Sequence, residues 1–201
     1  MAKLYFRYGT VGSAKTLNLL AVAHNYEQQG KNVLLVKPKI DTRFGEQHIK
    51  SRAGLERKAD IVVEKNSRLS TQSLYGIHCI LVDEAQFLNS AFIDHLRQIS
   101  RDVDIPVICY GLRTDFKTQF FVGSHRLMEL ADQIEEIKAT CHYCNRKAIF
   151  NLRVIDGQAT LAGPQIKLGT EEQYLPSCSS CYHEKISKIE REHVNAHIEL
   201  R

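Results

Sequence analysis

The sequence lacks the features that mark exported, membrane-spanning or repetitive proteins. No positively charged segment followed by a short apolar stretch opens the chain, and no apolar run approaches the roughly 18 residues that a membrane helix requires. It also has no internal repeat and no low-complexity tract. We therefore expect a cytoplasmic protein that has no membrane partner.

Charge of one sign is scarce as well. The 27 Lys and Arg residues exceed the 23 Asp and Glu residues by only +4 over 201 residues. This small surplus suits an anionic small ligand, but it falls short of the concentrated basic surface of a nucleic-acid binder. The 43% hydrophobic and 25% charged composition is that of a globular protein, and the length suits one α/β domain with a small appendage.

The beginning of the chain does contain a pattern typical of a phosphate-binding loop. It reads Gly9-Thr10-Val11-Gly12-Ser13-Ala14-Lys15-Thr16. An apolar run precedes it and a helical pattern follows, which is the strand–loop–helix context of such loops. Backbone N–H groups, a helix N-terminus, a lysine and a hydroxyl for Mg²⁺ would together hold a polyphosphate. The alternative interpretation is an ordinary glycine-rich turn between a strand and a helix.

One position departs from the pattern. Ala14 stands where a glycine is expected, and the loop there usually has a positive φ, which alanine resists at a cost of roughly 1 kcal/mol or more. We therefore expect Ala14 to be strained.

The order of apolar runs predicts an α/β fold. A strand over 4–8, a helix over 16–29 and a strand over 32–37 form a βαβ opening, which favours a mostly parallel sheet flanked by helices, as in P-loop NTPases. Residues 52–58 look like a surface loop. We expect further strands over 60–64, 77–82, 105–110 and 134–139, and helices over 71–75, 91–100 and 125–131.

An acidic pair closes the strongest predicted strand. Asp83 and Glu84 follow residues 77–82, and the carboxyl ends of parallel strands form the ligand crevice of an open α/β sheet. Asp83 is placed to hold Mg²⁺, and Glu84 is placed to take a proton from an attacking hydroxyl. The alternative is a pair of solvated carboxylates. The string Asp83-Glu84-Ala85-Gln86 also resembles helicase motifs, but a chain this short and weakly charged offers little surface for DNA.

The six cysteines fall into two groups. Cys79 and Cys109 sit singly in apolar runs, as small buried side chains do. Cys141, Cys144, Cys178 and Cys181 form two Cys-x-x-Cys pairs, whose spacing predicts a closed, structural zinc site; free thiols or disulfides are the alternative. His142 and His183 are expected at the surface.

A change of composition after Ala139 suggests a domain boundary. We expect a nucleotide-binding domain over 1–139, a zinc-ribbon domain over 140–185 and a charged helical tail over 186–201, either a surface helix or a partner contact. The loop over 148–176 lacks an evident core of its own. A loop of this length is usually functional, and a zinc-tethered loop beside a nucleotide site would serve as a lid over the phosphate acceptor.

Several side chains near these elements have two interpretations. The aromatic rings of Phe87, Phe116 and Tyr174 could line a pocket or could be core packing. Asp41 and Arg43 follow the second strand, at the expected ligand edge of the sheet, and could belong to the site or form a surface ion pair.

Taken together, these motifs resemble the thymidine kinases of the small, zinc-containing type found in many bacteria and in animal cytosol. The likeness covers Lys3 to about Cys181. Its motifs, in chain order, are the phosphate loop, Asp41-Thr42-Arg43-Phe44, Asp83-Glu84-x-Gln86-Phe87, Tyr110-Gly111-Leu112-x-x-x-Phe116, the two cysteine pairs, and Gly169 with Tyr174. Departures are Ala14, the Thr10-Val11 pair where the family has Pro-Met, and Thr170 where a second glycine is common.

The resemblance implies a reaction and a set of roles. The γ-phosphoryl of ATP would move to the 5′-hydroxyl of thymidine, with Glu84 as the general base. The residues that would bind ATP are the loop Gly9–Thr16 and Asp83, Glu84, Ala85 and Gln86. Those that would serve Mg²⁺ and the phosphoryl group are Thr16, Asp83, Asp41 and Arg43. Those that would bind thymidine are Phe87, Leu112, Phe116, Lys167, Gly169 and Tyr174. Family members are typically homotetramers inhibited by thymidine triphosphate.

Two rival functions remain open at this point. A P-loop ATPase could act on nucleic acid through a zinc ribbon, and a non-enzymatic zinc-ribbon adaptor could merely bind nucleotide. The first rival needs clustered Lys and Arg on the ribbon, whereas residues 141–182 carry only scattered ones.

Overall fold

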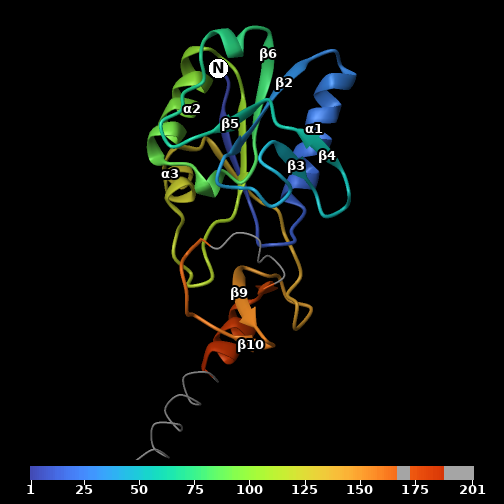
Figure 1. Cartoon of the computed structure of the whole chain (residues 1–201), viewed down its shortest axis with the longest axis vertical. Helices are drawn as coiled ribbons and strands as arrows, with labels where there is room; N and C mark the ends of the chain where they lie inside the picture. Colours follow the sequence, from blue (N-terminus) through green and yellow to red (C-terminus); the bar gives the residue numbers. More distant parts are fainter. Residues whose placement is uncertain (167–172, 188–201) are drawn as a thin grey trace, which may run out of the picture.

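A six-stranded sheet in which every pair of neighbours is parallel forms the larger part of the molecule (Figure 1). The computed structural model describes residues 1–166 and 173–187. The strand order is β5-β2-β6-β7-β1-β8, with β1 at Leu4–Tyr8, β2 at Asn32–Pro38, β5 at Ile61–Val63, β6 at Ile77–Val82, β7 at Val107–Gly111 and β8 at Gln133–Glu136. The predicted α/β fold with a mostly parallel sheet is confirmed.

Helices cover both faces of this sheet (Figure 1). The helices are α1 (Lys15–Gln28), α2 (Ser90–Asp102) and α3 (Val122–Leu130), with short 3₁₀ turns η1 (Gln72–Leu74) and η2 (Ala85–Phe87). Because side chains alternate along a strand, Leu34 and Ile80 pack in the cluster that holds α2 and α3. Their neighbours Leu35 and Leu81 pack on the other face, with α1. Two apolar faces explain the continuous apolar runs of these strands.

Most predicted elements are confirmed within a few residues. The predicted cap of α2 is confirmed, because the Asn89 side chain accepts a hydrogen bond from the Phe92 N–H. The expected surface loop over 52–58 is partly wrong. Residues Glu56–Lys58 form a strand, β4, which pairs antiparallel with β3 (His48–Lys50). Ile49 is the one buried residue of these two strands and packs beside α1, so the apolar pattern is too short to predict the hairpin.

A second, smaller sheet lies at the far end of the molecule (Figure 1). It has the order β10-β9-β11, with β9 at Phe150–Ile155, β10 at Gln158–Ala159 and β11 at Tyr174–Ser177. The expectation of one long loop over 148–176 is therefore wrong, because strands β9 and β10 and most of β11 lie within it. Leu152 of β9 packs with Tyr182 and Ile186 in a separate apolar cluster. Residues 179–187 are helical, and the rest of the predicted tail, 188–201, lies outside the described residues.

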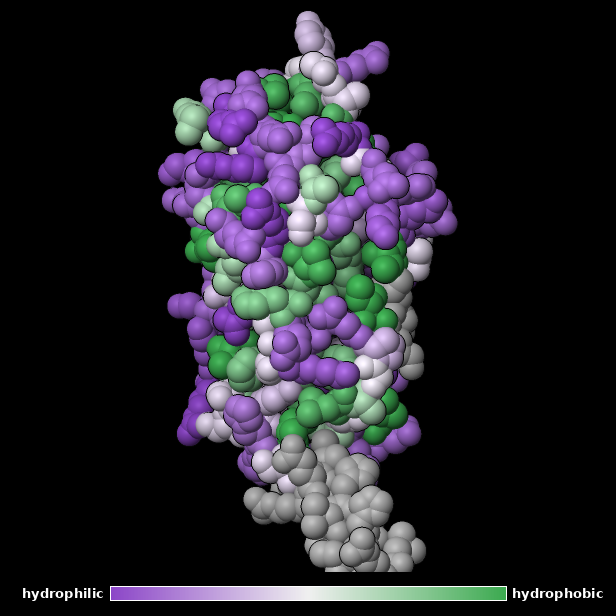
Figure 2. All heavy atoms as spheres, turned by 90° about the vertical axis from the view of Figure 1, so that its left-hand side faces the viewer, coloured by the Kyte–Doolittle hydropathy of each residue, from purple (hydrophilic) through white to green (hydrophobic). Residues whose placement is uncertain are grey.

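The outer face of α2 and α3 carries interspersed hydrophilic and hydrophobic side chains (Figure 2). Single exposed apolar residues such as Phe120 and Val122 are normal on the surface of a folded protein. Across the ranges that the structure describes, none of the helices has the length and apolar character needed to span a membrane.

Candidate functional site

The loop between β1 and α1 has the close-packed geometry that a phosphate loop needs. Gly9 donates its N–H to the Gly111 carbonyl at 3.2 Å, which ties the loop to the end of β7. A Cβ at Gly9 would lie 2.3 Å from Ser13 Oγ and 2.5 Å from the Ile137 carbonyl, so only glycine fits. Ala14 adopts φ 63° and ψ 28°, in the left-handed region, so the expected strain at this position is confirmed.

Lys15 turns back onto the loop. Its ammonium donates to the Thr10 carbonyl at 2.7 Å and lies 3.3 Å from the Gly9 carbonyl and 3.4 Å from Ser13 Oγ. Burial lowers the pKa of Lys15 to about 8, although the nearby charges of Glu84 and Asp83 oppose that shift. The side chain is therefore a buried cation that lies within reach of both acids.

Thr16 and Asp83 supply a pair of oxygen ligands beside the loop. The Thr16 hydroxyl lies 3.2 Å and 3.3 Å from the two carboxylate oxygens of Asp83. Asp83 follows β6, and its N–H bonds to the Val36 carbonyl of β2. A hydroxyl in the first turn of α1 and a carboxylate at the end of β6 are the hard oxygen donors that Mg²⁺ prefers.

Glu84 is held by two side chains, Arg43 and Gln86. Its Oε1 lies 2.7 Å from Arg43 Nη2, and its Oε2 accepts a hydrogen bond from the Gln86 amide at 2.5 Å. Arg43 also donates to Asp41 at 2.5 Å, and Asp41 is only 4% exposed. Asp41 and Arg43, whose side chains are only 5% and 15% exposed, therefore join Glu84 in one network, and the interpretation of this pair as a surface ion pair is wrong.

The two neighbouring acids differ in their electrostatics. Burial raises the pKa of Asp83, and the charge of Glu84 adds to the effect. Burial would raise the pKa of Glu84 too, but the charges of Arg43 and Lys15 outweigh it and lower this pKa. Glu84 is thus an ionised carboxylate at neutral pH, able to accept a proton.

A pocket opens between the loop and the β3–β4 hairpin. It is lined by Val11, Gly12, Lys15, Thr16, Arg43, Phe44, Lys50, Arg52, Glu84 and Leu112. Four of these side chains are cationic, which suits a polyanion. Lys50 and Arg52 were missed by the sequence reasoning. Lys50 ends β3 and Arg52 lies in the turn that follows, so only the fold of the hairpin brings the two side chains to the pocket.

A fully buried lysine fastens this hairpin to the sheet. Lys37 of β2 lies 3.3 Å from the Asp41 carboxylate and donates to the carbonyls of Gly45 and His48 at 3.2 Å and 2.8 Å. One cation therefore holds the segment that carries Arg43.

The predicted ATP residues Ala85 and Gln86 lie behind the pocket. Ala85 is fully buried in the core. Gln86 spans from Glu84 to the chain after β7, because its Oε1 accepts the Leu112 N–H at 3.0 Å. Gln86 thus orients the carboxylate that it contacts.

The predicted thymidine residues fall into separate groups. Leu112 lines the pocket. Phe116 is buried with its ring centroid 6.0 Å from that of Tyr174, and the Arg153 guanidinium lies 5.3 Å from the Phe116 ring. Phe87 instead packs edge-on against Phe121 and lines another groove, beside α2. The predicted residues Lys167 and Gly169, and the departure at Thr170, lie outside the described residues.

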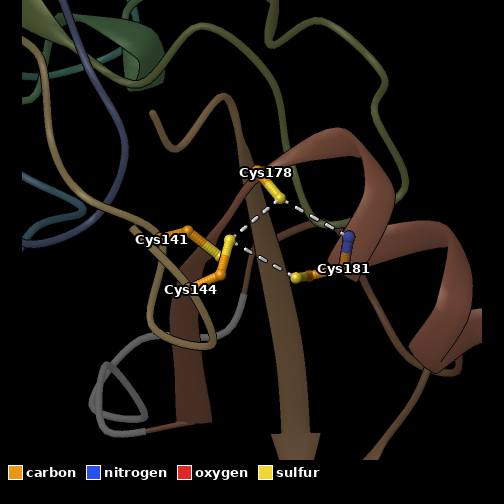
Figure 3. Close-up of side chains that lie close together, drawn as sticks. All are labelled: Cys141, Cys144, Cys178 and Cys181. Atoms are coloured by element: carbon orange, nitrogen blue, oxygen red, sulfur yellow. Dashed lines mark hydrogen bonds between the residues drawn. The ribbon is translucent and has the colours of Figure 1, made fainter. Parts of the chain in front are cut away.

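The four paired cysteines converge on one point (Figure 3). Their sulfur atoms all lie within 4.8 Å of one another, and Cys144 Sγ is 3.7 Å from the sulfurs of Cys178 and Cys181. A tetrahedral zinc with bonds of about 2.3 Å would set its sulfur ligands about 3.8 Å apart. None of the six cysteines forms a disulfide, so the disulfide alternative is wrong. Cys79 and Cys109 are buried, and His142 and His183 are exposed, as predicted.

A parallel α/β sheet with a phosphate loop and an acidic pair at the strand ends defines a P-loop protein, and its small appendage carries four cysteines that could hold a metal ion. The sequence model described as "Thymidine kinase" matches residues 2–182 of the chain, which therefore belongs to the thymidine kinase family.

Individual relatives agree over most of their length. Thymidine kinase of Streptococcus gordonii is 43% identical over 184 residues, covering 90% of this chain and 96% of the relative. Those of Lactococcus lactis subsp. lactis and Enterococcus faecalis are each 42% identical over 184 residues, covering 90% of this chain and 97% and 95% of the relatives. Among solved structures, the Pif1 helicase of Candida albicans aligns with a TM-score of 0.42 and 10% identity over 68% of this chain and 36% of that chain, a likeness too weak to bear on function.

Proposed function

We infer that the protein is a thymidine kinase, which transfers the γ-phosphoryl of ATP to the 5′-hydroxyl of thymidine and gives thymidine monophosphate. Family membership supports the substrate class. The observation that carries the reaction is the ionised Glu84 carboxylate, which lines the same pocket as Lys15 and Thr16 of the phosphate loop. A base next to a phosphate-donor loop is what transfer to a hydroxyl requires.

The donor half of the site uses the loop Gly9–Thr16. Its backbone N–H groups and the Lys15 ammonium would hold the donor phosphates, while Lys50 and Arg52 add positive charge from the hairpin. Thr16 and Asp83 would hold Mg²⁺, which neutralises charge on the phosphoryl oxygens when bound. Ala85 and Gln86 would support this half from behind.

In the acceptor half, Glu84 would take the 5′-hydroxyl proton as the bond to phosphorus forms. Each carboxylate oxygen has about two acceptor sites, so Glu84 can receive that proton while it keeps Arg43 and Gln86. Arg43, held by Asp41, would stabilise the charge that develops on the transferred group. The low pKa of Glu84 suits a loose transition state, in which positioning matters more than base strength.

Further proposals concern the surroundings of the site. Leu112, Phe116 and Tyr174 would shape the thymidine pocket, to which the family resemblance also assigns Lys167 and Gly169. We propose zinc for the four-cysteine cluster, whose all-thiolate ligand set is that of a closed structural site. From the family resemblance we also propose that the enzyme is a cytoplasmic homotetramer, that it serves DNA precursor synthesis and that thymidine triphosphate inhibits it.

The proposed function can be tested with phosphate transfer from ATP to thymidine, using deoxycytidine, deoxyadenosine and single-stranded DNA as comparators. The Glu84→Gln variant should lose transfer by about 100-fold or more, in line with general-base contributions, while it still binds thymidine. Glu135→Gln is the matched control, because this acid lies on the exposed edge strand β8 and pairs with Arg7. ATP hydrolysis stimulated by DNA and not by thymidine would contradict the proposal.

A further inference from the structure

One amide of the phosphate loop is bonded to a side chain from the far end of the sequence. The Val11 N–H donates to Asn151 Oδ1 at 2.8 Å, across 140 residues of chain. Asn151 lies in β9, which belongs to the small sheet. The middle of the donor loop is therefore held from outside the six-stranded sheet.

The other end of the same side chain is also engaged. Asn151 Nδ2 donates to the Thr114 carbonyl at 3.3 Å, and Asn151 is only 4% exposed. The amide thus accepts from one backbone group and donates to another inside the protein. Among side chains of this size and shape, only asparagine does both, because an aspartate cannot donate and a leucine can do neither.

The two backbone groups belong to the two halves of the proposed site. Val11 lies in the phosphate-donor loop, and Thr114 lies between Leu112 and Phe116, which are assigned to the thymidine pocket. The small sheet keeps Asn151 in place. Asn151 pairs with Pro176 of β11, and Ile149, two residues earlier, donates its N–H to the Ser177 carbonyl. The bridge from Val11 through Asn151 to Thr114 is therefore short, buried and supported on the side of β9.

We propose that Asn151 is a positioning residue that sets the spacing between the phosphate donor and its acceptor; this inference rests on the proposed kinase function. Phosphoryl transfer depends on the alignment of the two oxygens about phosphorus. A displacement of about 1 Å between reacting groups lowers the rate by about 100-fold. Loss of the bridge lets the donor loop and the acceptor segment shift relative to each other. ATP then meets water instead of the acceptor hydroxyl more often.

The test compares Asn151→Leu and Asn151→Asp with the wild-type protein. Leucine removes both hydrogen bonds at similar volume, and aspartate keeps the shape and the acceptor but loses the donor to Thr114. Leu152→Val is the matched control, because the neighbouring Leu152 side chain packs in the small core with Tyr182 and Ile186. For each protein we would measure the melting temperature, the yield of thymidine monophosphate per ADP formed, and the dissociation constant of a non-hydrolysable ATP analogue.

Both bridge variants should lower kcat/KM by about tenfold or more and lower the yield of monophosphate per ADP, whereas Leu152→Val should change only the melting temperature. A yield unchanged from wild type in both bridge variants would overturn the proposal, as would an equal loss in Leu152→Val. If the wild-type protein transfers no phosphate to thymidine, the proposed function fails separately. In that case, the affinity for the ATP analogue tests whether Asn151 positions the donor loop. A weaker affinity in Asn151→Leu but not in Leu152→Val supports this role, and equal affinities overturn it.

Discussion

Ala14 holds a backbone conformation that glycine adopts at lower cost. Its φ of 63° and ψ of 28° place an exposed methyl group in the left-handed region, immediately before the first turn of α1. Because the methyl is exposed, its removal costs little packing. The Ala14→Gly substitution therefore tests backbone strain almost in isolation.

The expected size follows from two opposing terms. Relief of the left-handed conformation gains about 1–2 kcal/mol. The greater conformational freedom of glycine in the unfolded chain lowers the free energy of unfolding by about 0.4–1 kcal/mol. The two terms leave a net increase of about 0–1.6 kcal/mol in the free energy of unfolding, and its midpoint near 0.8 kcal/mol corresponds to about 2–3 °C in Tm for a chain of this length. Phosphate transfer should be retained.

The matched control lies seven residues further on. Ala21 is also exposed, but it lies inside α1, where glycine is about 1 kcal/mol less favourable than alanine. The same chemical change should therefore have opposite signs at the two positions, measured by thermal and urea unfolding. If Ala14→Gly destabilises the protein as Ala21→Gly does, the assignment of strain to the phosphate loop is refuted.

Three further predictions concern the site and its supports. Arg43→Gln should lower kcat by about tenfold or more, and it should raise the pKa of Glu84, because the charge of Arg43 lowers that pKa. The acid limb of the pH profile of kcat/KM should then move to higher pH. An acid limb that does not move would argue against Glu84 as the base. Cys144→Ser should reduce bound zinc from one ion per chain and lower Tm, as metal analysis and calorimetry would show; full zinc retention would exclude a four-thiolate site. Tyr182→Phe should cost about 1–3 kcal/mol of unfolding free energy, because the buried Phe116 carbonyl loses the hydroxyl that donates to it at 2.6 Å; a loss below the error of urea unfolding would contradict this.

Patterns local to the sequence predicted the central fold. Residues 79–82 of the run over 77–82 are buried between both faces of a parallel sheet, which produces a continuous hydrophobic signal that needs no knowledge of its neighbours. The same holds for the phosphate loop and the cysteine pairs, whose spacing is itself the signal. The roles assigned to the individual site residues remain predictions.

Long-range partners account for what the sequence did not predict. The strands β3 and β4 are polar apart from Ile49, so nothing in their composition separates them from a surface loop. β9 is recognisable as a strand only once β11 and Tyr182 supply its partners. Asn151 is one polar residue in that strand, and its two contacts lie 140 and 37 residues away. No short stretch of the sequence contains both Asn151 and its partners, so no local pattern indicates these contacts.

The parallel sheet has a consequence for the order of assembly during synthesis. β1 pairs only with β7 and β8, so Leu4 meets Val107 and Tyr5 meets Gln133. At a synthesis rate of roughly 5–20 residues per second, β1 is made on the order of 10 s before its first partner strand, β7. Contacts this distant in sequence also close slowly. The phosphate loop, among the first segments to be synthesised, is thus among the last to gain its surroundings, and a nascent chain shorter than β7 holds no formed nucleotide site.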